Sequence, residues 1–361
     1  MSSSIRRSVP LLAVGLVAFA LRLHRLAEPL MRWDEGWSVA HASRTWSEVV
    51  RIASWEVHPP LFYLLLKPWL ALGRNVFVVR FFPVVVSMLA PPLAYRVARR
   101  WMGGERLGWL AAALTAVAPA LVYYGQVLRM YPLVVICLLL AAWAVLEWLA
   151  RPGTAVGRRA LLGLVLAGLA GLYTLYYAAF ALAGLYAYGL WRGQGRRKGL
   201  LAAGGATFAL YLPWVATAGP GLLERMGQAV PASSRMPVTP WDLAVSVWTG
   251  LTFDFGSGCW GALTVLATLV LAAAVARPSR RERWRLLLAL IALLVASVGA
   301  VVGSGAYFFA PRLLTPAVPF LLLLLAWGLD RLGQRSVWLL AGAAALLACT
   351  FYPTASRFVY E

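Results

Sequence analysis

Long apolar runs alternate with short polar segments along almost the whole chain. A membrane-spanning helix needs about 20 apolar residues, and eleven runs are candidates by length and composition. They occupy residues 9–26, 77–98, 108–125, 128–149, 160–174, 176–191, 199–217, 260–276, 286–303, 312–329 and 336–352. The pattern predicts an all-α polytopic membrane protein with about 11 transmembrane helices.

One further apolar segment is too short to be a crossing. Residues 61–73 are mostly apolar, but these 13 residues would form a helix of only about 20 Å, short of the ~30 Å hydrocarbon core. Counting the segment as a crossing would also reverse the side of every later basic loop. We therefore interpret it as an interfacial or re-entrant segment.

The composition supports a membrane protein and narrows the range of binding partners. Of the 361 residues, 61% are hydrophobic and only 13% are charged, which a soluble domain does not tolerate. The formal net charge of +20 would suggest nucleic acid if the basic residues shared one solvent face. They punctuate the apolar runs instead, so we expect no nucleic-acid partner. Cys137, Cys259 and Cys349 lie far apart, which supports neither a disulfide framework nor a zinc site.

Basic clusters fall between alternate apolar runs and predict the topology. They are Arg99/Arg100/Arg106, Arg158/Arg159, Arg192/Arg196/Arg197/Lys198, Arg277/Arg280/Arg281/Arg283/Arg285 and Arg331/Arg335. Placing them on the cytoplasmic side satisfies the positive-inside rule. The amino terminus is then inside, the carboxyl terminus outside, and residues 28–75 and 218–256 form outer loops. The acids left on the inner side are Glu105, Glu147, Glu282 and Asp330.

The first apolar run has two interpretations. Its basic start and small residues fit a cleaved signal peptide. Its continuation through residues 21–26 favours a retained signal anchor, which also preserves the topology above.

The first outer loop combines aromatic and amphipathic character. Its tryptophans are Trp33, Trp37, Trp46 and Trp55. Tryptophan favours the headgroup level of a bilayer. From Trp46 onward apolar residues recur at helical spacing, which predicts an amphipathic helix on the outer leaflet. The alternative is a solvated surface helix without a catalytic role.

Asp34 and Glu35 lie between two of these tryptophans, just outside the end of a membrane helix. Burial near lipid raises the pKa of a carboxylate, whereas nearby Arg32 would lower it. A carboxylate tuned in this way can act as a general base. Capping of a helix N-terminus by Asp34 explains the pattern equally well, and the residues alone leave both interpretations open.

Glu56 and His58 precede the rigid corner Pro59-Pro60, whose prolines set the entry angle of the next segment. His58, alone or with Glu56, can bind a phosphate or a divalent metal. An isolated interfacial histidine is more often only hydrogen-bonded, so this alternative stays open. The sequence indicates no other cofactor.

Three arginines lie at the expected outer ends of different helices: Arg80, Arg129 and Arg312. The positive-inside bias disfavours cations at that side. Their fork-shaped guanidinium groups suit an anionic, phosphate-bearing headgroup on which several of them could converge. Each could instead snorkel singly to lipid phosphates.

Several of these segments together resemble a known family. They are Trp33-Asp34-Glu35, His58-Pro59-Pro60 with residues 61–66, Arg80 at the start of a long helix, Tyr123-Tyr124-Gly125-Gln126, Arg129-Met130-Tyr131, and Pro311-Arg312 with residues 313–319. In order and spacing the chain resembles the bacterial glycosyltransferase family 39-like proteins. These are GT-C membrane glycosyltransferases related to protein O-mannosyltransferases and to the aminoarabinose transferase that modifies lipid A. The resemblance covers most of residues 10–330, and the first 130 carry its specific part.

The resemblance implies a GT-C fold, with short helices in the first outer loop. It implies inverting transfer of a sugar from a polyprenyl-phosphate donor to a lipid, glycan or protein hydroxyl, at the outer face of a bacterial cytoplasmic membrane. Asp34 would be the catalytic base, and Glu35 would orient the acceptor or a nearby arginine. The candidates for binding the donor phosphate are His58, Arg80, Arg129 and Arg312. The candidates for contact with the acceptor or for a lid are Glu56, Tyr131 and Asp254.

Two departures from the family pattern limit which residue roles the resemblance implies for this chain. Many members have an acid after the glutamine of a Gln-Glu-Ala-Arg pattern, where this chain has Val127, so the role of that acid does not carry over. Some relatives have an acid and a lysine before the Pro-Pro pair, where Val57 and His58 stand here. Metal use therefore does not carry over either.

We expect one transmembrane GT-C domain over residues 1–361, without a soluble C-terminal domain. Residues 1–217 would form the catalytic module, 218–256 a loop that covers the site or receives the acceptor, and 257–361 the C-terminal helices. Two other functions stay open, a polyprenyl-lipid flippase or transporter and an inactive scaffold paralogue. Nearly uncharged mid-helix regions and the lack of an internal repeat count against a transporter, whereas Val127 keeps the paralogue open.

Overall fold

The computed structural model describes residues 3–227, 247–248, 251, 278–308 and 311–345. All regular elements in these residues are helices. They are α1 (Ser3–Leu23), α2 (Trp33–Ala42), α3 (Trp46–Ala53), α4 (Leu61–Trp69), η1 (Leu70–Leu72), α5 (Val76–Ser87), α6 (Ala90–Met102), α7 (Glu105–Val117), α8 (Pro119–Gln126), α9 (Tyr131–Ala150), α10 (Ala155–Leu172), α11 (Ala178–Arg192), α12 (Arg197–Gly227), α15 (Arg280–Phe308), η3 (Pro311–Leu314) and α16 (Val318–Arg335). Residues 337–345 are helical as well.

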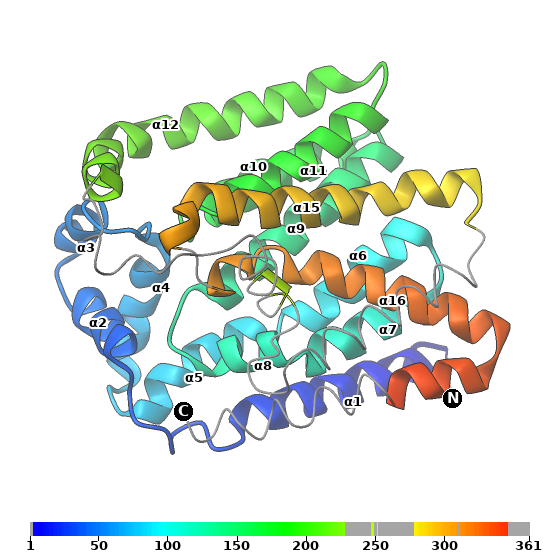
Figure 1. Cartoon of the computed structure of the whole chain (residues 1–361), viewed down its shortest axis with the longest axis horizontal. Coiled ribbons are helices and arrows are strands. Elements are labelled where there is room, and N and C mark those ends of the chain that lie inside the picture. The colour runs from blue at the N-terminus through cyan, green and yellow to red at the C-terminus, as the bar shows by residue number, and fades with distance from the viewer. Residues whose placement is uncertain (1–2, 228–246, 249–250, 252–277, 309–310, 346–361) are drawn as a thin grey trace.

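Most of the long helices lie side by side along one direction of the molecule (Figure 1). The short helices α2, α3 and α4 lie at one end of this bundle, at the left of the picture. Helix α9 is the central element, since it contacts α5, α6, α8, α10 and α11 and Val134, Leu138 and Val145 are fully buried. A helix that is apolar on all sides is buried in this way.

Four helices of the described residues are long and apolar enough to cross a membrane. They are Val76–Met102, which joins α5 and α6, Tyr131–Ala150, Ala155–Leu172 and Arg197–Glu224. Helices α7 and α8 make a fifth if this pair, bent by 50°, is one broken span. The all-helical polytopic class is thus confirmed, whereas the expected number of eleven crossings is not. The run 260–276 lies outside the described residues.

The first outer loop contains the short helices that its pattern predicts. Residues 61–72 form α4 and η1, and Gly73 follows as the C-cap. This apolar stretch, Leu61–Leu72, is shorter than a span. Its start is tied to the bundle because the Leu61 amide donates to the Tyr173 carbonyl at 2.9 Å. Helix α3 begins at Trp46 after the N-cap Thr45. Val49 faces inward with no exposed surface, whereas Trp46 is 56% exposed, which is the amphipathic arrangement expected for this segment.

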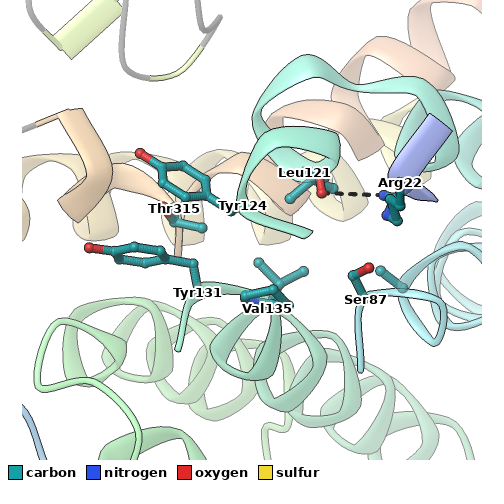
Figure 2. Close-up of a pocket in the computed structure, with 9 residues that line it drawn as sticks. Arg22, Ser87, Leu121, Tyr124, Tyr131, Val135 and Thr315 are labelled. Atoms are coloured by element: carbon teal, nitrogen blue, oxygen red, sulfur yellow. Dashed lines mark hydrogen bonds between the residues drawn. The ribbon is translucent and has the colours of Figure 1, made fainter. Parts of the chain in front are cut away.

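The break between α7 and α8 is stabilised by Arg22 of α1. Pro119 opens α8 and has no N–H group, so it cannot bond the carbonyl of Thr115 in the preceding turn. Arg22 is fully buried and donates to the carbonyls of Thr115 at 3.4 Å, Ala116 at 2.8 Å and Leu121 at 3.4 Å, the last drawn in Figure 2. Among the described residues no carboxylate forms an ion pair with this buried cation, and the carbonyls of Thr115 and Ala116, at the negative C-terminal end of the α7 dipole, compensate its charge.

A small cavity lies beside Arg22 (Figure 2). Its volume of about 10 Å³ is close to the minimum that holds one water molecule. The Nε atom of Arg22 has no hydrogen-bond partner among the described residues. Ser87 and Tyr124 line the same cavity.

The end of the bundle away from α2–α4 gathers opposite charges. Glu147 lies 2.8 Å from the Nε of Arg100 and 3.3 Å from Arg151. The other ion pairs there are Arg99–Glu105 at 3.8 Å, Arg106–Asp330 at 3.5 Å and Arg331–Glu282. The four acids assigned to the basic side by sequence therefore share one end with the basic clusters.

Candidate active site

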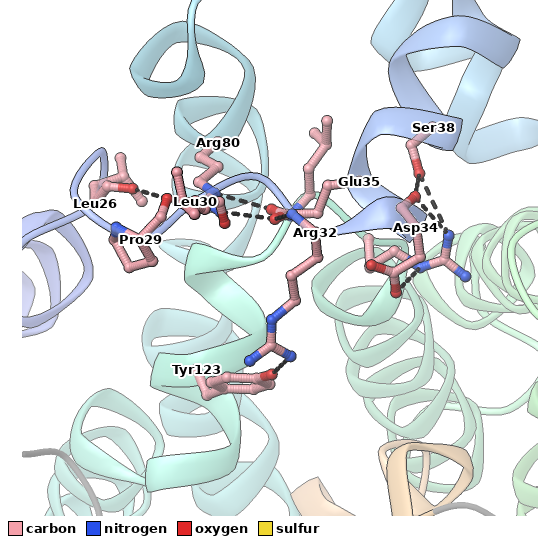
Figure 3. A network of polar contacts seen from close by, with 11 residues as sticks. Leu26, Pro29, Leu30, Arg32, Asp34, Glu35, Ser38, Arg80 and Tyr123 are labelled. Carbon is pink, nitrogen blue, oxygen red and sulfur yellow. Dashed lines mark hydrogen bonds and ion pairs between the residues drawn. The ribbon is translucent and has the colours of Figure 1, made fainter. Parts of the chain in front are cut away.

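Helix α2 positions the two adjacent acids in its first turn. Glu35 caps the helix, because its Oε2 accepts from the amide of Arg32, the N-cap residue, at 3.0 Å. The capping role considered for Asp34 thus belongs to Glu35. Neighbouring residues on a helix point about 100° apart, and Figure 3 shows Asp34 and Glu35 directed to different partners.

Glu35 forms a buried ion pair with Arg80 of α5. The Nε of Arg80 lies 2.9 Å from Oε1, and Nη2 lies 2.7 Å from Oε2. Glu35 also accepts from the amide of Leu128 at 2.9 Å. Burial would raise the pKa of Glu35, but the Arg80 side chain, the Leu128 and Arg32 amides and the Arg80 charge together hold it below its usual value. Glu35 is therefore ionised, and each of its carboxylate oxygens accepts two hydrogen bonds from protein groups.

Arg80 has no donor left for another ligand. Its remaining N–H groups donate to the carbonyls of Leu26 at 3.0 Å, Pro29 at 2.8 Å and Leu30 at 3.0 Å, so five contacts occupy the five donors of a guanidinium. Only 4% of the residue is exposed. Arg80 therefore lies within the wall of the outer loop, with all its donors engaged by protein groups.

Asp34 faces a second arginine, Arg129, from the chain between α8 and α9. The Oδ2 of Asp34 lies 3.7 Å from the Nε of Arg129, and 38% of the Asp34 side chain is exposed. Arg129 also donates from Nη1 to the Asp34 carbonyl at 3.2 Å and to Ser38 Oγ at 3.4 Å. Asp34 is thus held near a cation while its carboxylate remains accessible.

His58 contacts a different guanidinium nitrogen of Arg129 from the one that faces the Asp34 carboxylate. Its Nε2 lies 2.7 Å from Nη2 of Arg129, and because a guanidinium only donates, the imidazole accepts through this nitrogen. Burial and the charges of Arg129 and Arg312 lower the pKa of His58 to about 3. The ring is therefore neutral with its proton on Nδ1, an atom that has no partner among the described residues.

Arg312 lies on the turn η3 and completes the cationic side of the site. Its charge acts on His58 and on Tyr131, so the guanidinium lies in their neighbourhood. The residue is exposed, and no carboxylate of the described residues forms an ion pair with it. The structure therefore brings together Asp34, His58, Arg129 and Arg312 from four separate segments of the chain.

Two tyrosines lie near the guanidinium of Arg129, whose charge acts on both of their hydroxyls. They are Tyr63 of α4 and Tyr131 of α9. Burial raises the pKa of Tyr63 to about 12, so its hydroxyl stays protonated. Tyr131 was a candidate from sequence, whereas Tyr63 was not, although it lies five residues after His58 in the same motif. Its ring also stacks on His41 at 4.1 Å between centroids.

Arg32 and Gln126 also make contacts near the site that the sequence does not predict. Arg32 contacts the Tyr123 hydroxyl (Figure 3), and its guanidinium carbon lies 5.4 Å from the centroid of that ring. Gln126 donates to the carbonyls of Leu21 at 3.1 Å and His24 at 3.0 Å, which ties the end of α8 to the end of α1. No sequence pattern indicates these partners, because each pair is separated by about a hundred residues.

The remaining candidates lie at the margin of the site or outside the described residues. The charge of Glu56 acts on His41 and Tyr63. Within the described residues, no group of three or more His, Cys, Asp or Glu side chains could hold a metal ion. Asp254 and most of the loop 218–256 lie outside the described residues.

Comparison with known proteins adds a family match and a shared architecture. Residues 57–216 match the family model of dolichyl-phosphate-mannose-protein mannosyltransferase. No curated protein matches the chain in sequence. The structure resembles ArnT from Cupriavidus metallidurans in the apo state, with a TM-score of 0.66 and 18% identity over 96% of this chain and 64% of that one.

Two further structures have the same architecture. ArnT from Cupriavidus metallidurans bound to undecaprenyl phosphate matches with a TM-score of 0.64 and 18% identity, over 96% of this chain and 64% of that one. The archaeal oligosaccharyltransferase AglB from Archaeoglobus fulgidus, in complex with an inhibitory peptide and a dolichol-phosphate, matches with a TM-score of 0.61. The identity is 14% over 98% of this chain and 56% of that one. The chain thus spans less than two thirds of the length of these proteins. The family match over residues 57–216 and the shared architecture together show that the chain has the GT-C glycosyltransferase fold.

Proposed function

We propose that the chain is an inverting glycosyltransferase that moves a hexosyl or pentosyl unit from a polyprenyl-phosphate donor to an acceptor hydroxyl. The observation that carries this proposal is the accessible carboxylate of Asp34 beside the cationic group of Arg129, His58 and Arg312. An acid that can remove a proton and cations that can hold a phosphate are the two requirements of this reaction. The fold and the lipid phosphates bound by ArnT and AglB support the same donor class.

Asp34 is the proposed general base. Its neighbour Glu35 accepts hydrogen bonds from Arg80, Leu128 and Arg32, so it has no free role at the reacting centre. Asp34 makes one longer ion-pair contact with Arg129 and can still receive an acceptor hydroxyl. General-base catalysis of this kind contributes about 10²–10⁴ in rate.

The donor phosphate is proposed to bind between Arg129, Arg312 and His58. Arg312 is exposed and without an ion pair among the described residues, and the buried Nδ1–H of His58 has no partner there. A neutral imidazole can donate to a phosphate oxygen without adding charge. These donors are placed before the substrate arrives, which favours stabilisation of charge that develops during the reaction.

Transfer then proceeds as a single displacement at the anomeric carbon. The acceptor oxygen forms a bond to this carbon while the bond from the carbon to the phosphate oxygen breaks. The acceptor proton passes to the Asp34 carboxylate, and the electron pair of the broken bond remains on the polyprenyl phosphate. Arg129 and Arg312 offset that negative charge.

Arg80 has a different role from the one that the sequence suggests. All its donors are engaged within the loop wall, so we assign it with Glu35 to positioning. The pair fixes the first turn of α2, and the Leu128 amide that binds Glu35 belongs to the residue before Arg129. Asp34 and Arg129 are thus oriented by the same buried pair.

We further propose that the site faces the outside of a bacterial cytoplasmic membrane, with a lipid, glycan or protein as the acceptor. The basic clusters at the opposite end of the bundle support this orientation through the positive-inside rule. The amino terminus would then be cytoplasmic.

The test uses purified full-length protein reconstituted in vesicles with a radiolabelled polyprenyl-phosphate sugar and a membrane extract as the acceptor source, without ATP or nucleotide sugar. We expect labelled sugar on the acceptor and release of an equal amount of polyprenyl phosphate. Movement of intact donor between leaflets without release would indicate a flippase. Donor binding without either reaction would indicate a non-catalytic scaffold.

A further inference from the structure

Three helix ends converge at the basic end of the bundle, far from the site described above (Figure 1). They are the end of α6, the end of α11 and the beginning of α15. The indole Nε1 of Trp101 donates to the Arg285 carbonyl at 2.6 Å, and Arg285 Nη1 donates to the Met102 carbonyl at 3.1 Å. The rings of Trp191 and Trp284 lie 4.9 Å apart between α11 and α15. These contacts hold the side chains of the junction in place.

The junction brings three other arginines near Arg285. Burial and the charges of Arg281, Arg192 and Arg100 all disfavour the charged form of Arg285. The charge of Arg192 also acts on the hydroxyl of Tyr188, which lies on the preceding turn of α11. We refer to Arg100, Arg192, Arg281 and Arg285 as the arginine cluster.

Acidic residues compensate this charge only in part. Glu147 pairs with Arg100 at 2.8 Å, but it shares its carboxylate with Arg151. Glu282 pairs with Arg331 on α16. Among the described residues no carboxylate forms an ion pair with Arg192, Arg281 or Arg285. Arg192 and Arg281 are exposed and Arg285 is half-buried, so solvent screens part of the repulsion among these like charges. An external anion bound among them would reduce the remainder and stabilise the junction.

The aromatic residues indicate the depth at which this anion lies. Trp191 and Trp284 are each 36% exposed next to the arginines, and tryptophan concentrates at the headgroup level of a bilayer. Arginine binds phosphate with two parallel hydrogen bonds, and basic pockets between membrane helices bind anionic headgroups. We propose that the arginine cluster is a binding site for the phosphodiester headgroup of an anionic phospholipid.

This site is independent of the proposed transfer reaction, and its test requires no activity. Thermal unfolding of the full-length protein is measured in detergent micelles containing dioleoylphosphatidylglycerol, and in micelles with the same fraction of dioleoylphosphatidylcholine. A ligand that binds only the folded state raises the unfolding temperature. We expect phosphatidylglycerol to raise it for the wild type, and the double variant Arg192→Gln/Arg281→Gln to lose most of this increment. Arg285 is left unchanged because it also caps α6.

The matched control is Arg158→Gln/Arg159→Gln, which removes the same charge from exposed positions of α10 at the same end of the molecule. It should retain the increment. Loss of the increment in both double variants, or in neither, would overturn the site, as would its absence in the wild type. Inorganic phosphate is the third arm, and an equal increment from phosphate alone would overturn the lipid assignment.

Native mass spectrometry provides a second measurement if the double variant unfolds too readily for the comparison. The single variant Arg192→Gln is then compared with Arg159→Gln for the number of phosphatidylglycerol molecules retained. We expect fewer on Arg192→Gln, and equal numbers would contradict the proposal.

Discussion

Glu35 and Arg80 form a buried two-contact ion pair, with N–O distances of 2.9 and 2.7 Å, that joins the first turn of α2 to α5. Arg80 also donates to three carbonyls of the loop before α2, and Glu35 also accepts from the amide of Leu128. It therefore separates the two adjacent acids by function. Glu35 holds the loop together, and Asp34 is left at the surface of the site.

The first prediction concerns this pair. Glu35→Ala should destabilise the protein by about 3–5 kcal/mol, because it leaves the Arg80 charge buried and unpaired. Thermal or denaturant unfolding in detergent measures the effect. The double variant Glu35→Met/Arg80→Met should lose less than the sum of the two single variants, since neither charge then remains. If the loss of stability in the double variant equals the sum of the losses in the two single variants, the two side chains are not coupled.

The second prediction separates Asp34 from its neighbour. Asp34→Asn should fold and bind the polyprenyl-phosphate sugar, yet transfer about 10²–10⁴ more slowly, because an amide cannot take the acceptor proton. Transfer is measured at saturating donor and acceptor, with donor binding in parallel. Glu48→Gln is the control, since Glu48 lies on the same loop and its carboxylate accepts from Thr45, which is not a residue of the site. Near-normal transfer by Asp34→Asn would leave the base to be sought elsewhere.

Arg312→Ala should weaken donor binding as well as turnover. A cation that faces the phosphate acts on the bound ground state and on the transition state alike. A hydrogen bond to a charged group is worth about 1.5–3 kcal/mol, and for an exposed arginine we expect the lower figure, about a tenfold rise in Kd. Arg51→Ala, an exposed arginine of α3, is the control. If donor affinity and activity are both unchanged, Arg312 only contacts lipid phosphates.

A fourth prediction follows from the neutral His58. Burial and two neighbouring arginines lower its folded pKa to about 3, whereas an unfolded histidine titrates near 6.5. The unfolded state thus binds more protons in this interval, so stability is complete above about pH 6.5 and falls as the pH decreases toward 3. The unfolding temperature of His58→Asn should depend less on pH over this range. His41 is unchanged in both proteins, so an identical pH profile would show that His58 is not buried in this way.

The fifth prediction concerns Gly125 of α8, which lies against Arg22 at the break between α7 and α8. A Cβ at this position would lie 3.0 Å from Ser87 Oγ and 3.1 Å from Arg22 Nε, and Arg22 cannot move because its other nitrogens hold the carbonyls of α7 and α8. Gly125→Ala should therefore destabilise by about 1–3 kcal/mol. Gly36→Ala is the matched control, since a Cβ there meets no atom within 4 Å and alanine favours a helix. Equal stability of the two variants would mean that Arg22 does not constrain Gly125.

Much of this protein was determined by the sequence itself. Apolar runs of span length must become helices in a bilayer, because no water is present to satisfy the backbone. The short run at residues 61–73, the amphipathic helix at Trp46 and the basic clusters at one end are local patterns, and the structure has all three. The motifs also pointed to the neighbourhood that Asp34, His58, Arg129 and Arg312 share.

Tertiary packing decided which side chain does what within that neighbourhood. Asp34 and Glu35 are adjacent and chemically alike, and only the position of Arg80 on α5 makes one of them a buried partner and leaves the other accessible. Arg80 was expected to bind phosphate for the same reason as Arg129, yet the carbonyls of the loop wall take its donors. The role of Arg22 follows from no pattern in the sequence, because the carbonyls that it binds lie about a hundred residues away and Pro119 leaves that of Thr115 without its helical donor. Hydrogen bonds between distant segments depend on where the helices pack, and no local pattern encodes that.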